Sequence, residues 1–202
     1  QGNPRDDQMD YLKTLRFSGN HLLTLVNDVL DYNKMESGKI VFEQVQFNFN
    51  DFMDEIMRSY SFRSKAKHLE FIINKEGNVP AEVIGDQIRL NQILSNLLSN
   101  ALKFTNQGGI TVTIREIEKK GSQSKLEFSV HDTGIGIPKD KHSSIFESFT
   151  QASAETTRQY GGSGLGLAIV DDLARMYGGQ LTLAESSLGG LLATLNLPAI
   201  VQ

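Results

Sequence analysis

Apolar residues recur at helical spacing along the first 35 positions of the chain. Leu15, Leu22 and Val29 lie seven residues apart, and the stretch 8–35 contains no proline. A helix with an apolar stripe of this kind buries it against another element. We expect one long helix that packs either on its own domain or in a helix bundle. The polar exit 36–39 resembles a helix end before a linker and favours the bundle.

After residue 40 the pattern becomes a mixture of alternating and helical segments. The helix expected over 50–67 should turn Phe52, Ile56 and Phe62 inward. We expect an α+β fold, a two-layer sandwich in which helices cover one face of a mixed, mostly antiparallel sheet. The complete set comprises helices over 50–67, 87–104 and 165–177 and strands over 40–47, 68–74, 109–118, 125–132, 180–185 and 191–197.

Composition narrows the possible functions. The 202 residues carry 24 acidic and 20 basic side chains, a net charge of −4, which excludes a strongly basic nucleic-acid binder. The absence of cysteine excludes disulfides, cysteine zinc sites and thiol nucleophiles. No apolar run reaches the roughly 18 residues of a membrane span. We expect two domains, 1–39 and 40–202, in a cytoplasmic chain that meets a membrane only through segments outside this sequence.

The helix expected over 87–104 has an unusual polar strip. Gln92, Asn96, Asn100 and Lys103 fall within an arc of about 80° at helical spacing. Asparagine is a poor helix former, and a purely structural helix usually exposes Glu, Lys and Arg instead. Amide carbonyls beside one lysine suit a hydrated divalent cation carried by phosphate oxygens. The alternative is an ordinary solvated face that happens to contain asparagine.

A glycine-rich turn follows the strand expected over 125–132. Asp132 ends this strand, and Gly134 and Gly136 follow it at alternate positions. Such glycines let the backbone approach a flat ligand closely, and the aspartate can accept a hydrogen bond from an exocyclic amine. The alternative is a common turn. The segment also resembles the Asp-Thr-Gly of aspartic proteases, but those enzymes pair two such segments and this chain has one.

A second glycine-rich segment, 161–167, opens the helix expected over 165–177. N–H groups at a helix start bind anions, and glycines remove side chains that would block a phosphate. The segment is neither a Walker A loop nor a dinucleotide fingerprint, because it lacks their Lys-Ser/Thr and their glycine register. The alternative is a flexible hinge. The preceding stretch 143–158, rich in serine and threonine, is typical of a mobile loop.

The order and spacing of these segments resemble the boxes of sensor histidine kinases of the hybrid type. Residues 96–105 resemble the N box, 132–137 the G1 box, 145–151 the F box and 162–167 the G2 box. Residues 27–39 are similar to the second helix of the dimerisation and phosphotransfer domain. The resemblance implies an ATP-binding sandwich of the Bergerat type, shared with heat-shock chaperones, type II topoisomerases and mismatch-repair ATPases.

The resemblance also implies a role for each matching residue. Asn100 would be the principal Mg²⁺ ligand, and Asn96, a second candidate ligand, would lie with Lys103 at the phosphates. Asp132 would accept from the adenine amino group, against a wall made by Gly134 and Gly136. The phosphates would lie at the start of the helix, on Gly162, Ser163, Gly164, Leu165 and Gly166.

Further roles concern the ATP lid and the reaction. The lid would span 138–160, with Phe146 and Phe149 as anchors, and Arg158 would reach the γ-phosphate. Gln92 would stand where the ATP-hydrolysing relatives carry a catalytic glutamate. An amide cannot take a proton as a carboxylate does, so ATP hydrolysis should be poor.

The implied activity is transfer of the γ-phosphate of ATP to a histidine, the first step of signalling to a response-regulator receiver domain. The family's acceptor histidine precedes a glutamate, whereas none of the four histidines here does. The acceptor helix would therefore belong to another part of the same protein or to another kinase chain, and the full-length protein would be a homodimer, cytoplasmic or the cytoplasmic part of a membrane-bound sensor. The alternative is a nucleotide-binding regulatory or interaction module without kinase activity.

Overall fold

The computed structural model describes residues 6–37, 40–142, 144–147, 150 and 164–201. The chain divides into two units, Gln1–Ile40 and Val41–Gln202. None of the helices among the described residues is both long and apolar enough to span a membrane.

The first unit consists of one helix, α1 (Asp6–Glu36). It ends where the Ser37 N–H donates to the Asn33 carbonyl and the Ser37 hydroxyl donates to the Lys34 carbonyl. Its apolar stripe lies at the surface of this chain, because Leu15 and Leu22 are 68% and 61% exposed. The expected long helix is therefore present.

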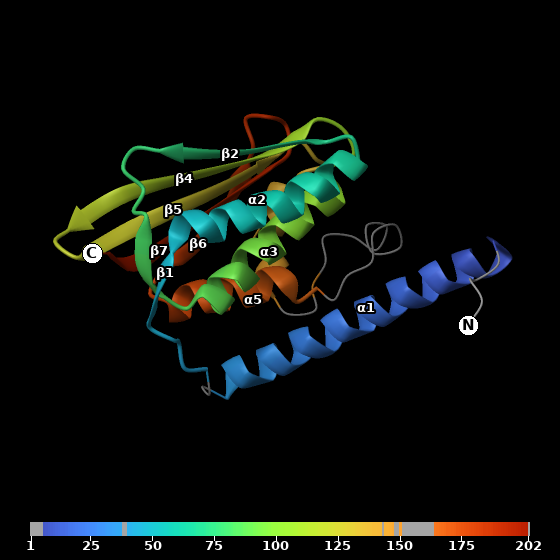
Figure 1. Ribbon diagram of the computed structural model, residues 1–202, viewed down its shortest axis with the longest axis horizontal. Helices are drawn as coiled ribbons and strands as arrows, with labels where there is room; N and C mark the ends of the chain where they lie inside the picture. Colours follow the sequence, from blue (N-terminus) through green and yellow to red (C-terminus); the bar gives the residue numbers. More distant parts are fainter. Residues whose placement is uncertain (1–5, 38–39, 143, 148–149, 151–163, 202) are drawn as a thin grey trace. The chain divides into compact units, whose positions relative to one another are not determined.

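The second unit is a sheet with helices on one face (Figure 1). The strand order is β1-β3-β7-β5-β4-β2, with β6 paired to β7 off this path. Only the β2–β4 pair is parallel among the described strands. The expected mixed, mostly antiparallel sandwich is confirmed. The strands are β1 (Val45–Asn48), β2 (Glu70–Glu76), β3 (Glu82–Gly85), β4 (Gly109–Lys120), β5 (Gln123–Asp132), β6 (Gln180–Glu185) and β7 (Leu191–Val201).

The core lies between this sheet and three helices, α2 (Phe49–Ala66), α3 (Gln87–Phe104) and α5 (Gly166–Met176). Alternate residues of β4 and β5 are buried, as expected for a sheet with one covered face. The buried side chains of these two strands are Ile110, Val112, Ile114, Leu126, Phe128 and Val130.

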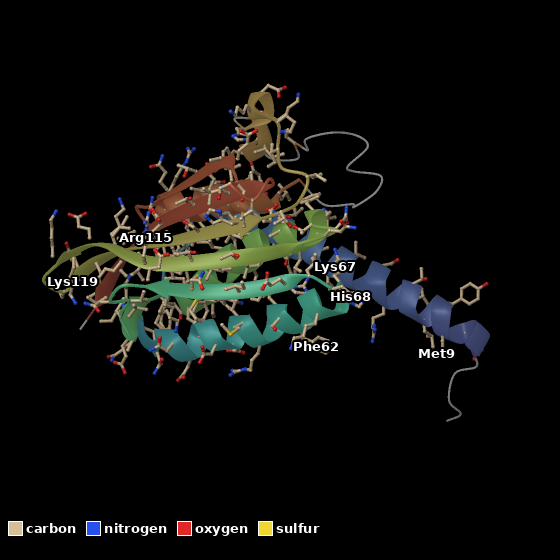
Figure 2. All side chains as sticks on the ribbon, turned by 90° about the horizontal axis from the view of Figure 1, so that it is seen from above. Met9, Phe62, Lys67, His68, Arg115 and Lys119 are labelled. Carbon is tan, nitrogen blue, oxygen red and sulfur yellow. The ribbon has the colours of Figure 1, made fainter. Side chains whose placement is uncertain are left out.

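Two expectations about this unit are wrong. Phe62 is 78% exposed and lies on the outer side of α2 (Figure 2). It lies about 120° around the helix from Ile56, and Tyr60 fills the inward position instead. The strand expected over 40–47 begins only at Val45, because Phe42 packs on the Tyr177 ring and the Glu43 N–H donates to the Asp86 carboxylate.

Candidate functional site

Asp132 lies at the end of β5 with its carboxylate held from two sides. Its Oδ1 accepts from the Gly134 N–H at 2.8 Å and from the Leu191 N–H at 3.1 Å. Burial raises the pKa of this carboxyl, and the two backbone hydrogen bonds oppose that rise. Its Oδ2 bonds to none of the described residues. One carboxylate oxygen is thus fixed by the fold, and the other can accept from a ligand.

The turn after Asp132 is fastened to two other elements. The Thr133 N–H donates to the Gly109 carbonyl at 3.2 Å, and the Thr133 hydroxyl donates to the Gln107 carbonyl at 2.6 Å. A Cβ on Gly134 would lie 2.5 Å from the Phe104 carbonyl oxygen at the end of α3. Gly136 has a φ of +65°, a conformation that favours glycine. Gly134 therefore serves close backbone approach, and Gly136 serves the backbone conformation of the turn.

The second glycine-rich segment meets α3 at the start of α5. A Cβ on Gly166 would lie 3.9 Å from Nδ2 of Asn100, so the two helices bring the expected G2 and N boxes together. Leu165 precedes α5 and gives it no side-chain cap. The first N–H groups of a helix attract anions. Gly164 has a φ of +70° and turns the chain into the helix.

The polar strip of α3 divides into two parts. Asn96, Asn100 and Lys103 are half-buried toward the carboxyl end of the helix, where burial lowers the pKa of the Lys103 ammonium. Gln92 lies nearer the start, and its Oε1 accepts from Nη1 of Arg89 at 2.8 Å. Eight residues separate Gln92 from Asn100, about 12 Å along the axis. The structure therefore places Gln92 with Arg89 rather than with Asn100 and Gly166.

Binding of a divalent cation at this site would depend on the side-chain amides of Asn96 and Asn100. The part of the chain that the structure describes contains no group of three or more His, Asp or Glu that could hold a metal. Asn96 and Asn100 offer neutral carbonyl oxygens, and Asn100 lies beside the start of α5. This donor set fits a cation that brings its own phosphate and water ligands.

The expected lid is described only in part. Phe146 is half-buried in a short 3₁₀ helix, η2 (Ser144–Phe146), which packs against α5. Before it, Nε2 of His142 lies 2.9 Å from the Ile137 carbonyl oxygen. Four expected site residues, Phe149, Arg158, Gly162 and Ser163, lie outside the described residues.

The sequence interpretation missed one residue of this site, Gly190. A Cβ there would lie 2.2 Å from Oδ1 of Asp132. Gly190 precedes β7 in sequence, far from the expected boxes, and no local pattern distinguishes it from an ordinary turn glycine.

A separate groove of about 630 Å³ lies between α2 and the first half of α3, next to β1. Its walls include Phe52, Ile56, Ile88 and Asn91. None of the expected site residues lines it, so we do not assign the nucleotide chemistry to this groove.

Comparisons with known proteins show the family of this chain. The family model "Histidine kinase-, DNA gyrase B-, and HSP90-like ATPase" matches residues 85–200. The chain is 40% identical over 175 residues to the signal transduction histidine-protein kinase BarA of Escherichia coli, a match that covers 87% of this chain and 19% of BarA. It is 42% identical over 193 residues to the autoinducer 2 sensor kinase/phosphatase LuxQ of Vibrio cholerae, covering 96% of this chain and 22% of LuxQ. The chain therefore spans about a fifth of the length of these relatives.

Solved structures give the same assignment. Full-length ShkA, crystallised in complex with AMPPNP, superposes with a TM-score of 0.80 at 32% identity, covering 100% of this chain and 41% of ShkA. Histidine kinase ThkA in complex with the response regulator TrrA has a TM-score of 0.69 at 21% identity, covering 98% of this chain and 53% of ThkA, a likeness of fold. The chain therefore belongs to the histidine kinase-, DNA gyrase B- and HSP90-like ATPase family, in which it carries the ATP-binding catalytic domain of a histidine kinase of two-component signal transduction.

Proposed function

We propose that this chain binds ATP with Mg²⁺ and transfers the γ-phosphate to a histidine on a separate acceptor helix. The observation that carries the proposal is the Asn100 amide beside Gly166 at the uncapped start of α5. An uncapped helix start attracts phosphate oxygens, and an amide carbonyl is a ligand that Mg²⁺ accepts. The start of α5 therefore offers N–H groups for the phosphate, and α3 offers the Asn100 carbonyl for Mg²⁺.

The base would be recognised at the end of β5. Oδ2 of Asp132 is available to accept a hydrogen bond from the exocyclic amino group of adenine. Gly134 and Gly136 add no side chains to the turn that follows, so a flat ring can approach the backbone. The likeness to ShkA, whose structure contains AMPPNP, supports the same class of ligand.

The chemistry assigned to the protein is positioning and charge neutralisation. Asn96 and Asn100 would hold Mg²⁺, which neutralises phosphate charge when it is bound, and Lys103 would add a further positive charge. Gln92, which would stand where the ATP-hydrolysing relatives carry a catalytic glutamate, is an amide, as is Asn96 one helical turn before Asn100, and an amide cannot act as a general base for water. We therefore expect transfer to histidine to be favoured over hydrolysis.

The remaining partners follow from the histidine kinase family. We propose that the full-length protein is a cytoplasmic homodimer, or the cytoplasmic part of a membrane-bound one, that passes the phosphate to a receiver domain. The complex of ThkA with the response regulator TrrA supports this kind of partner. The four histidines of this chain all lack the following glutamate of the acceptor motif, so the acceptor would be supplied by another segment or chain.

Calorimetric titration of ATP with and without Mg²⁺ tests the proposed site. We expect Mg²⁺ to strengthen ATP binding to the wild-type chain, and Asn100→Ala to remove that gain, a loss of about tenfold in affinity. The matched control is Asn91→Ala, because Asn91 lies on the same helix but lines the groove beside α2. Equal effects of the two substitutions would contradict the assignment of Asn100.

Phosphotransfer is tested separately by adding an acceptor helix domain from a histidine kinase together with labelled ATP. We expect Mg²⁺-dependent label on the acceptor histidine and loss of it in Asn100→Ala. Metal-independent binding of ATP with no transfer to any acceptor would overturn the kinase proposal and favour a regulatory nucleotide-binding module.

A further inference from the structure

The backbone before β7 touches the Asp132 carboxylate. A Cβ on Gly190 would lie 2.2 Å from Oδ1 of Asp132 and 2.5 Å from both the Asp132 carbonyl oxygen and the Gly134 nitrogen. Real Cβ atoms essentially never come closer than 3.0 Å to such neighbours. Any side chain at position 190 would therefore have to push the carboxylate or the turn after it.

This close approach creates one of the two bonds that hold the carboxylate. Leu191 follows Gly190, and its N–H reaches Oδ1 of Asp132 at 3.1 Å, across 59 residues of sequence. The second bond, from the Gly134 N–H, comes from the turn itself. With Oδ1 engaged twice, the carboxylate cannot rotate without losing a hydrogen bond, and Oδ2 keeps a fixed direction.

Gly189 and Gly190 are required to be glycine for different reasons. Gly189 has a φ of +99°, and a Cβ there would meet nothing within 4 Å. Gly190 is not among the glycines with positive φ, so its backbone would accept alanine. The requirement at position 189 is backbone conformation, whereas at position 190 it is space for Asp132 and for the backbone of Gly134.

We propose that Gly190 is a positioning residue that sets the base specificity of the nucleotide site through Asp132. This inference rests on the proposed function. Because Gly190 allows the chain entering β7 to close on Oδ1, Oδ2 is fixed where it accepts from an exocyclic amino group. Inosine triphosphate carries a carbonyl where adenine carries its exocyclic amino group. Its carbonyl oxygen and Oδ2 of Asp132 are both hydrogen-bond acceptors, so this base is disfavoured.

The first experiment compares binding of ATP and inosine triphosphate by calorimetry. We expect the wild-type chain to prefer ATP, and Gly190→Ala to lower the ratio of the two affinities by about tenfold. Gly85→Ala is the matched control, because it also replaces a glycine whose φ is not positive, but a Cβ there would meet no atom within 4 Å. It should leave the ratio unchanged. A folded Gly190→Ala chain with the wild-type ratio would overturn the proposal.

The second experiment needs no nucleotide. Carbon-13 NMR follows the titration of the Asp132 carboxyl, and amide exchange follows the Leu191 N–H. In Gly190→Ala the loss of the Leu191 hydrogen bond should raise the pKa of Asp132 further and speed exchange at Leu191, because that bond lowers the pKa. Unchanged values in Gly190→Ala would overturn the positioning role. If the wild-type chain did not bind ATP, the proposed function would fail, while these NMR values would still decide the role of Gly190.

A double variant covers the case in which Gly190→Ala does not fold. In Asp132→Ala/Gly190→Ala the contact of the new methyl with the carboxylate is gone, whereas its contacts with the Asp132 carbonyl oxygen and the Gly134 nitrogen remain. Relative to Asp132→Ala, the double variant should therefore lose less stability than Gly190→Ala loses relative to the wild-type chain. Equal losses in the two backgrounds would show that the clash is not with the Asp132 side chain and would overturn the proposal.

Discussion

His68 follows the last turn of α2 with a left-handed backbone, at a φ of 58° (Figure 2). Its N–H donates to the Lys65 carbonyl, and the Leu69 N–H donates to the Ser64 carbonyl, which closes the helix. We expect His68→Gly to raise the free energy of unfolding by about 0.5–1 kcal/mol. Glycine adopts this backbone without the penalty of a Cβ, and this gain exceeds the stability lost because glycine has more entropy in the unfolded chain. Urea unfolding measures the change.

A β-branched residue at the same position supplies the control for His68. His68→Val should lower the free energy of unfolding, because valine tolerates positive φ poorly. If the glycine and valine variants changed stability in the same direction, backbone strain would not be the cause.

Asp132 couples the candidate site to stability through its raised pKa. A carboxyl whose pKa is higher in the folded than in the unfolded chain favours folding below its unfolded value, near 3.8, and that contribution is lost as the pH rises through the folded value. Asp132→Asn should therefore raise the melting temperature at pH 7, by about 2–4 °C for each kcal/mol gained, and by less near pH 3.5. Thermal unfolding at the two pH values tests this.

The same variant should bind ATP more weakly. Asparagine can keep the hydrogen bonds from Gly134 and Leu191 with its Oδ1, but it turns an amide nitrogen toward the adenine amino group. A variant that is more stable and still binds ATP as tightly as the wild-type chain would contradict the role of Asp132 in base recognition.

At the scale of elements, Tyr177 joins three segments at the end of α5. Its hydroxyl donates to the Asp86 carbonyl at 3.1 Å and accepts from the Asp86 N–H at 3.0 Å, just before α3. Its ring centroid lies 4.2 Å from that of Phe42, and the Glu43 N–H donates to the Asp86 carboxylate. Tyr177 thereby fixes the segment before β1 to the end of α5. The other end of α5, at Gly166, lies next to Asn100.

Tyr177→Phe removes both hydroxyl hydrogen bonds and keeps the ring. We expect a loss of about 1–2 kcal/mol of unfolding free energy and faster amide exchange at Asp86. Burial raises the pKa of Tyr177 to about 12, so its contribution is present below the ordinary value of 10.0 and is lost between these two values. The difference between wild type and variant should therefore shrink as the pH rises above about 10.

The control for Tyr177 is an exposed ion pair. Arg115 pairs with Glu127 at 2.6 Å but is 51% exposed, so Arg115→Ala should change stability by less than about 1 kcal/mol (Figure 2). If Tyr177→Phe destabilised the chain no more than Arg115→Ala, the hydroxyl would not hold these segments together.

The elements that the sequence predicts well are those with a long, regular pattern. The helix expected over 87–104 coincides with α3, because its apolar residues repeat over eighteen positions between an aspartate cap and Thr105. β3 was missed, because Glu82–Gly85 is too short for alternation to be recognised. The amphipathic pattern predicts Phe62 in the core, but its position about 120° around the helix from Ile56 leaves it exposed.

The candidate site divides in the same way. Asp132 and Asn100 belong to local motifs whose residue types indicate ligand binding. Both could therefore be proposed as site residues from the sequence. Gly190 could not, because its role depends on a contact with Asp132 that only the β5–β7 pairing creates. The hydrogen bond between Gln92 and Arg89 could not be predicted either, because it depends on the conformations of both side chains.

At the scale of the whole chain, α1 carries exposed apolar side chains. Leu15, Leu22 and Leu23 are 68%, 61% and 63% exposed. Single exposed leucines are ordinary, but a stripe at heptad spacing is typical of a helix that packs against other helices. We therefore expect the chain to associate weakly through α1, whereas residues 41–202 have a core of their own.

Sedimentation velocity over a range of concentrations tests the role of α1. Wild-type chain should show concentration-dependent association, and Leu22→Glu should abolish it, because a carboxylate in an apolar seam loses its hydration. Thr24→Glu is the matched control, since position 24 lies about 160° around the helix from Leu22 and about 100° from Leu23, and the substitution adds the same charge. Both variants should bind ATP like the wild-type chain, because the substitutions lie outside residues 41–202. A wild-type chain that stayed monomeric at high concentration, or equal behaviour of the two variants, would show that the stripe of α1 does not drive association.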